Sequence, residues 1–142
     1  MPEERYPPSP KTELDGLPYI PRMCEKIRMF ASGCLAEDLH PNLGIGMDKW
    51  TCQFLGVDYD DLKAVVLEGK SDEEVLAWAR EAGVERPEHE RDWWLAFMRS
   101  VGFRDRLREK LQARITESGL ADRDDILTMF DYIDADEGRG GA

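Results

Sequence analysis

The chain has 142 residues, and its 30 acidic side chains against 19 Lys and Arg give a net charge of −11. This length suits one domain with one core, and a hydrophobic fraction of 42% excludes wholesale disorder. The negative charge repels nucleic-acid phosphates and anionic lipid surfaces. No apolar run approaches the ~20 residues of a membrane span. We therefore expect a protein that binds neither nucleic acid nor membrane.

The start of the chain, MPEERYPPSP, has neither the basic nor the apolar region of a signal peptide. We therefore expect a cytoplasmic protein. Its cysteines, Cys24, Cys34 and Cys52, form an odd set without a CxxC pair, which argues against a disulfide framework and against a zinc knuckle. The pattern predicts reduced, partly buried thiols, no metal and no cofactor.

Six of the eight prolines fall within the first 21 residues, where they disfavour helices and strand ladders. We predict an extended Pro-rich arm over residues 1–20. Apolar anchors such as Tyr19 would lay its second half across the domain or against a partner chain. Residues 21–142 are predicted to form a single helical domain with an acidic C-terminal tail.

The first predicted helix covers roughly residues 22–38, because Met23, Ile27, Phe30 and Cys34 recur at helical spacing. A short helix follows over 48–55 and ends at Gly56. A third helix starts after Asp58, which can serve as its N-cap, and ends at Gly69.

Four further helices are predicted from capping signals and apolar stripes. Ser71 and Glu74 form a capping box that opens the fourth, and Pro87 opens the fifth. A sixth helix carries apolar residues from Phe103 to Ile115, and a seventh begins after Asp122. Since no alternating, β-branched run appears, we predict a compact all-α domain of six to seven helices.

The loop from His40 to Lys49 holds candidate ligand-binding residues, Asn42, Gly44 and Gly46. Two glycines before a helix N-terminus let backbone amides approach a small anion. The alternative is a tight interhelical connection that uses glycine for its positive φ.

Asp48 and Cys52 are four residues apart and share a helix face, and His40 could fold back toward them. These three residues are the catalytic candidates. The alternative interpretation makes Asp48 a helix cap, Cys52 a core residue and His40 a loop residue beside proline.

The acidic tail contributes Asp131, Asp134 and Arg139 as further ligand-binding candidates. A calcium loop fails, because the position that requires glycine falls on Arg139. A solvated helix end or an acidic partner surface is the alternative.

Adjacent residues in a helix point about 100° apart, so one face cannot bury both Trp93 and Trp94. One indole is expected at a groove or interface, and the alternative packs both under the arm. The interface candidates are Trp93, Trp94 and Tyr19.

Charge is uneven along the C-terminal half of the chain. Residues 103–114 hold five basic and two acidic side chains, whereas the chain from Glu117 onward holds eight acids against Arg123 and Arg139. We expect these two patches to meet within the fold or across a homo-oligomer.

Four segments, LPYIPRMCEKIR (17–28), HPNLGIGMDKWTCQFLGVDYDDL (40–62), GKSDEEVLAWARE (69–81) and RDDILTMFDYIDADEGR (123–139), resemble a family of small bacterial proteins classed as a domain of unknown function. The resemblance implies a compact helical domain in a bacterial cytoplasm and supplies no activity. It also directs attention to the His40–Asp48 loop, Cys52 and the Asp131–Arg139 tail.

Two functional hypotheses remain open at this point. The first is a non-enzymatic binding or regulatory module that engages a protein partner, or a second copy, through its arm, an exposed Trp and the tail. The second is an enzyme or small-ligand binder whose polar pocket is formed by six residues: His40, Asp48, Cys52, Asp131, Asp134 and Arg139.

Overall fold

The computed structural model describes residues 5–139. In this range, a short hairpin with strands of two residues each precedes seven α-helices and one 3₁₀ helix. The all-α prediction is therefore confirmed. The elements are β1 (Glu13–Leu14), β2 (Leu17–Pro18), α1 (Ile20–Ser32), η1 (Glu37–Asn42), α2 (Met47–Leu55), α3 (Tyr59–Leu67), α4 (Asp72–Ala82), α5 (Glu88–Ser100), α6 (Arg108–Glu117) and α7 (Met129–Asp136).

Helix boundaries follow the local signals where these are strong. The capping box before α4 forms in both directions, since the Glu74 amide donates to the Ser71 hydroxyl and the Ser71 amide donates to the Glu74 carboxylate. α2 ends at Gly56 in the left-handed conformation, and α5 begins directly after Pro87. Signals that act within a few residues therefore coincide with these boundaries.

Three predicted boundaries were wrong. α1 ends at Ser32, and residues 37–42 form η1 instead of extending it. α6 begins at Arg108 because the Asp105 carboxylate accepts the Gly102 and Leu107 amides and so fixes a turn before it. α7 begins only at Met129, where Thr128 caps it.

The hairpin was missed by sequence reasoning, although its turn carries a known signal. Asp15 and Gly16 both have positive φ, 51° and 78°, as a type I′ turn requires, and Leu14 pairs with Leu17 across it. Upstream, Arg5 forms a parallel bridge with Leu35. The described part of the predicted arm thus follows the helical body, while residues 1–4 lie outside the described residues.

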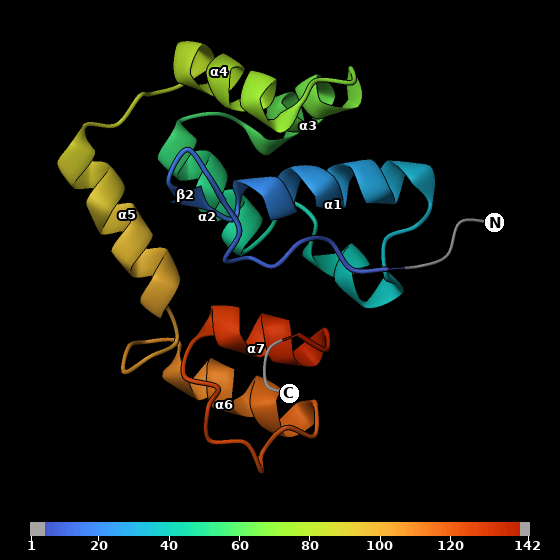
Figure 1. Cartoon of the computed structure of the whole chain (residues 1–142), viewed down its shortest axis with the longest axis vertical. Coiled ribbons are helices and arrows are strands. Elements are labelled where there is room, and N and C mark those ends of the chain that lie inside the picture. Colours follow the sequence, from blue (N-terminus) through green and yellow to red (C-terminus); the bar gives the residue numbers. More distant parts are fainter. Residues whose placement is uncertain (1–4, 140–142) are drawn as a thin grey trace.

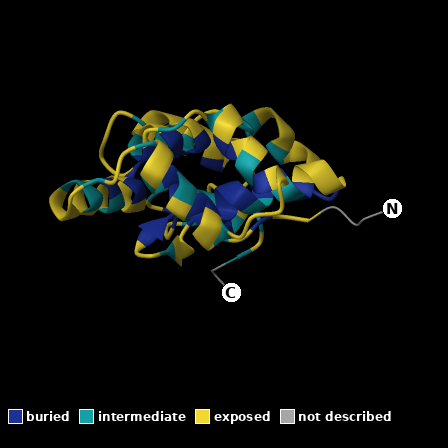
Figure 2. Ribbon diagram, turned by 90° about the horizontal axis from the view of Figure 1, so that it is seen from above, coloured by how far each residue is buried: buried dark blue, intermediate teal, exposed yellow. Residues whose placement is uncertain are grey.

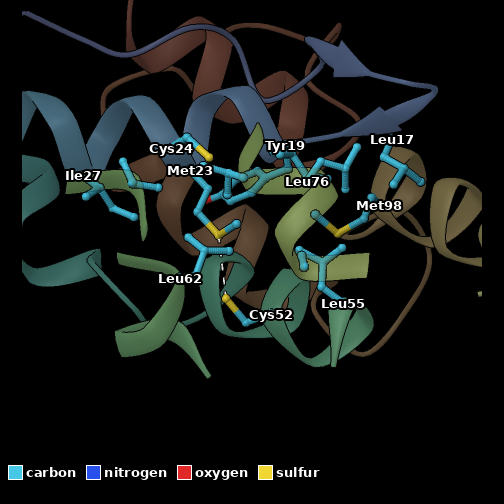
Figure 3. Packing of buried hydrophobic residues seen from close by; sticks show 14 of the residues in the cluster. Leu17, Tyr19, Met23, Cys24, Ile27, Cys52, Leu55, Leu62, Leu76 and Met98 are labelled. Carbon is cyan, nitrogen blue, oxygen red and sulfur yellow. Dashed lines mark hydrogen bonds between the residues drawn. The ribbon is translucent and has the colours of Figure 1, made fainter. Parts of the chain in front are cut away.

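The helices form two groups joined by α5 (Figure 1). α1 to α4 form the larger group, and α6 and α7 lie together at the far end of α5. The main core contains Met23, Ile27 and Leu62 (Figure 3). Phe130 of α7 also belongs to it. A second cluster centres on Leu111 of α6.

Two residues of α2, Met47 and Trp50, pack against both clusters. Buried residues line the inward faces of the helices, and exposed residues cover the outside (Figure 2). Phe30, expected in the apolar stripe of α1, is instead 44% exposed and meets the His40 ring edge-on. Within the described range, no helix has the length and apolarity to span a membrane.

Candidate functional site

A cavity of about 420 Å³, here called the central cavity, lies between the α1/α2 side of the molecule and α6/α7. Residues from α1, η1, α2, α6, α7 and the loop before α2 line it. Met47 and Trp50 give it an apolar part. Many of the other lining residues are polar or charged, so the chemistry of the cavity depends on how these groups are paired.

Asp48 lies beneath the cavity and is completely buried. Its carboxylate accepts the Tyr19 hydroxyl at 2.6 Å, the Gly44 amide at 2.9 Å and the Lys26 ammonium at 3.0 and 3.2 Å. As the second residue of α2, it also lies at the positive end of that helix dipole. Asp48 is therefore held by two separate segments of the chain, α1 with its N-cap and the loop before α2.

Tyr19 and Lys26 border the cavity above Asp48, and each side chain is almost fully buried. Burial lowers the pKa of Lys26 below its ordinary value, and the Asp48 carboxylate acts in the opposite direction. Burial, followed by the charge of Asp48, raises the pKa of Tyr19 well above its ordinary value. The phenol thus keeps its proton at neutral pH and donates a hydrogen bond to Asp48.

The backbone at this site adopts unusual conformations. Tyr19, the residue that caps α1, has φ 78°, a left-handed conformation that costs a non-glycine residue free energy. Gly44 has φ 76°, and a Cβ there would lie 3.0 Å from the Tyr59 ring. The loop therefore needs glycine to bring the Gly44 amide to Asp48.

A second buried ion pair joins α1 to the tail at the same cavity. The Arg22 guanidinium donates to both carboxylate oxygens of Glu137, at 2.9 and 2.5 Å, and to the Pro8 carbonyl. Burial opposes the charge of Arg22, but the hydrogen bonds and charge of Glu137 raise its pKa. Arg139 donates to Glu137 as well, at 2.6 Å, and to the Pro7 carbonyl.

We call the five residues of these two networks the floor: Tyr19, Arg22, Lys26, Asp48 and Glu137. Each carboxylate of the floor is bonded to a cation of α1. The walls differ, because Lys110 and Arg114 of α6 and Asp38 and Asp136 are exposed cavity residues. Within residues 5–139, none of these four side chains forms an ion pair.

The predicted loop residues converge on this cavity. Asn42 and Gly46 line it, the Gly44 amide bonds Asp48, and Asp48 anchors its floor. Asp48 is not the N-cap of α2, because Gly46 occupies that position.

The other two catalytic candidates lie elsewhere. His40 bonds the Leu35 carbonyl through Nε2 at 2.9 Å and contacts Phe30. Cys52 is buried in the main core against the Met23 sulfur, and burial raises its pKa to about 12 (Figure 3). Cys24 is equally buried, with its pKa raised to about 12 by burial.

The tail candidates are divided. Asp134 accepts the Ser9 hydroxyl at 2.9 Å and pairs with Arg139, so both hold the N-terminal segment against the tail. Asp131 pairs with Lys11 at 2.8 Å and borders a separate groove. The basic residues 103–114 and the acidic C-terminal segment were expected to meet. The helices α6 and α7 of these segments pack together, but no ion pair joins them in the described residues.

The interface candidates also separate. Trp93 is 67% exposed, whereas Trp94 is buried and stacks on Phe54 with ring centroids 4.9 Å apart. Trp94 borders an open aromatic groove of about 700 Å³, and its indole nitrogen has no hydrogen-bond partner in the described part of the chain. Tyr19 lies in the interior instead of at a surface.

Sequence reasoning missed Arg22, Lys26 and Glu137. Arg22 and Lys26 are four residues apart on α1, and each directly precedes an apolar residue, Met23 or Ile27. This spacing could have indicated two charged side chains on one face of the helix, next to its apolar stripe. Glu137 carried no comparable signal. No group of three or more His, Cys, Asp or Glu in the described residues could hold a metal ion.

Comparison with known protein families identifies the family of the chain. Residues 4–139 match the model of a family described as "Domain of unknown function (DUF5069)", which covers nearly the whole chain. The matched range includes all four segments that carried the resemblance, without testing which of them defines the family. No curated protein matches the chain.

Proposed function

The chain belongs to the DUF5069 family, and we propose that this member of the family is a binding protein for a small molecule. The ligand occupies the central cavity and rests on the floor. This proposal joins the binding role and the pocket that the sequence suggested as separate hypotheses. It uses Asn42, Gly44, Gly46 and Asp48, and it leaves His40 and Cys52 in structural roles.

The observation that carries the proposal is the Tyr19–Lys26–Asp48 network at the base of a cavity. Buried ion pairs are often no more stabilising than apolar residues of the same volume, because desolvation offsets their attraction. A left-handed tyrosine adds about 1–3 kcal/mol of strain. A binding role accounts for both costs, since strained and buried polar groups cluster at functional sites.

The size and lining of the cavity support the same proposal. About 420 Å³ lies within the range of small-molecule sites, roughly 300–1,000 Å³. Ile45, Met47 and Trp50 offer apolar surface, and a few placed polar groups accompany them. This combination is typical of a pocket that selects its ligand by hydrogen bonds and by shape.

Binding is favoured over catalysis by the condition of the reactive side chains. The Cys52 thiol is buried with a pKa near 12, so it is almost entirely protonated at neutral pH. His40 faces a backbone carbonyl instead of the cavity. The Asp48 carboxylate already accepts hydrogen bonds from three residues, so its oxygens are occupied by groups of the protein. A ligand from the pool of a bacterial cytoplasm suits this role.

The test is a thermal-shift screen of a metabolite library with three proteins. Ile45→Trp fills the cavity from an exposed position, and Leu67→Trp places the same side chain at an exposed site of α3 away from it. A ligand at a hundred times its Kd adds about 2.7 kcal/mol to the stability of the folded state. Compounds should stabilise the wild type and Leu67→Trp but not Ile45→Trp. Hits that stabilise all three proteins equally would contradict the proposal.

A second candidate function rests on the outer face of α5. Trp93 and Phe97, one turn apart, are 67% and 44% exposed, and large exposed aromatic residues are typical of protein interfaces. This face would serve the protein-interaction role predicted from sequence. Light scattering of the wild type and of Trp93→Ala tests self-association, and an unchanged monomeric mass for both would count against it.

A further inference from the structure

The walls of the central cavity carry two exposed basic residues at one end and two exposed acidic residues at the other. This arrangement indicates which class of ligand the cavity takes. We propose that the ligand is a small zwitterion whose anionic and cationic groups lie several bonds apart. The anionic group binds Lys110 and Arg114, and the cationic group binds Asp38 and Asp136. This inference rests on the proposed function, because it names the class of molecule that the cavity takes.

The basic end lies on α6. Lys110 and Arg114 are four residues apart, so they project from one face of the helix toward the cavity. Neither has an ion-pair partner within the described residues, although the chain carries a net charge of −11. Three acids of the tail pair with other cations instead, namely Asp131 with Lys11, Glu137 with Arg22 and Asp134 with Arg139. Two cations therefore remain available to an incoming anion.

The acidic end is formed by η1 and the end of α7. The Tyr6 hydroxyl donates to Asp38 at 3.2 Å. Burial and then the charges of Asp38, Asp136 and Glu137 raise the pKa of Tyr6. Both wall carboxylates line the same cavity. Glu137 is neutralised by Arg22, whereas Asp38 and Asp136 have no cation in the described residues. They can pair with a cation from outside.

The two ends are separated along α7. Leu111 of α6 packs with Met129, the first residue of α7, and Ser118 after α6 bonds Tyr132 at 2.6 Å, so the helices run side by side in the same direction (Figure 1). Lys110 consequently lies toward the start of α7 and Asp136 at its end. Seven residues of helix span roughly 10 Å. Arg114 lies one helical turn beyond Lys110 on α6 and therefore between the two ends.

The remaining lining fits the middle of such a molecule. Met47, Trp50 and Ile45 provide apolar surface, and the floor charges are already paired with each other. A ligand with one anionic group alone would leave Asp38 and Asp136 without a cation. A ligand with two cationic groups would meet Lys110 and Arg114. A zwitterion with an apolar chain between its charges satisfies both ends.

Calorimetric titration with ω-amino acids of increasing length tests the inference. The probes are 4-aminobutanoate, 6-aminohexanoate and 8-aminooctanoate, with hexanoate and hexylamine as single-charge controls. We expect affinity to rise with length until the molecule spans both ends, and 6-aminohexanoate to bind about ten-fold more tightly than either control. Equal binding of 6-aminohexanoate and its controls, or no binding of any ω-amino acid, would overturn the inference.

Paired variants locate each end. Lys110→Ala/Arg114→Ala should remove the advantage of 6-aminohexanoate over hexylamine, and Asp38→Asn/Asp136→Asn its advantage over hexanoate. Arg104→Ala/Arg108→Ala and Asp122→Asn/Asp124→Asn make the same charge changes at exposed positions outside the cavity lining. Both control variants should bind like the wild type. If the control variants lose binding as well, the effect comes from the net charge of the protein and the inference is wrong.

The two proposals can fail separately. If library compounds lose their effect in Ile45→Trp but carry no charge, the cavity is a binding site and the zwitterion is wrong. If compounds stabilise Ile45→Trp and Leu67→Trp alike, the binding site itself is wrong.

Discussion

The floor and the walls of the central cavity use the same kinds of side chain in opposite ways. On the floor, Lys26 and Arg22 are buried and bonded to Asp48 and Glu137. On the walls, Lys110 and Asp136 are exposed and lack ion pairs within the described residues. Burial therefore decides the role of each charged side chain. A buried charge must be paired within the protein itself, whereas an exposed charge can pair with a ligand.

The comparison predicts its largest effect at Asp48. Asp48→Asn keeps the shape of the side chain but leaves the buried Lys26 ammonium without a counter-charge. We expect a loss of about 3–5 kcal/mol in the free energy of unfolding, measured by urea denaturation. The exposed Asp124→Asn should change stability by less than about 0.5 kcal/mol. Similar small losses for both variants would contradict a structural role for the floor.

Arg22→Met should have the next largest effect. It removes the partner of Glu137, but Arg139 still donates to that carboxylate at 2.6 Å, so the acid keeps one cation. A loss of about 2–3 kcal/mol is expected, below the usual cost of breaking a buried pair. Arg80→Met, which breaks the more exposed pair with Asp15, should cost at most about 1 kcal/mol. Equal costs would show that burial does not separate the two pairs.

The alkaline limb of the stability profile gives a smaller effect. The pKa of Tyr19 is raised above its ordinary 10.0, so above pH 10 the unfolded chain loses this proton while the folded protein keeps it. The unfolded state then binds fewer protons, and stability falls as the pH rises. Lys26 acts oppositely. Between its lowered pKa and 10.5, the unfolded chain binds the proton that the folded protein lacks, so stability rises with pH.

Tyr19→Phe isolates the tyrosine contribution. Its deficit in unfolding free energy relative to the wild type should shrink from pH 9 to pH 11, because the variant has no phenol to titrate. Tyr6→Phe, at a 38% exposed position, should show a weaker trend. Denaturant titrations at several pH values measure both. A deficit for Tyr19→Phe that stays constant across this range would refute the raised pKa.

The walls should show the smallest effect on stability. Lys110→Ala and Arg114→Ala remove exposed side chains with no ion pairs in the described residues, and each should change the free energy of unfolding by less than about 0.5 kcal/mol. Thermal denaturation checks this expectation. A loss of unfolding free energy as large as that of Arg22→Met would show that these cations stabilise the fold, which contradicts the comparison.

Much of the fold could be predicted from sequence because its signals are local. The Ser71–Glu74 capping box and the left-handed Gly56 act within a few residues, and they placed the start of α4 and the end of α2 correctly. The Asp15-Gly16 turn was equally local, and it was missed because its strands have two residues each. Helix starts at α6 and α7 depended on the side chains of Asp105 and Thr128, which periodicity does not show.

The site could be predicted only in part. The glycines of the loop marked Gly44 and Asp48, because a loop that brings an amide to a carboxylate needs glycine. The partners of the floor are 22 residues apart for Lys26 and Asp48 and 115 apart for Arg22 and Glu137. A single sequence does not pair such positions. His40 and Cys52 show the converse, since their nearness to Asp48 in the sequence suggested chemistry that burial and backbone bonding do not support.

The most direct test of the central claim is a crystal structure of the protein with a compound that stabilises it in the thermal-shift screen. The compound should lie in the central cavity between α1 and α6, with a polar atom within hydrogen-bond distance of Tyr19 or Lys26. A compound bound instead in the aromatic groove beside Trp94, with the central cavity filled by water, would contradict the proposed site.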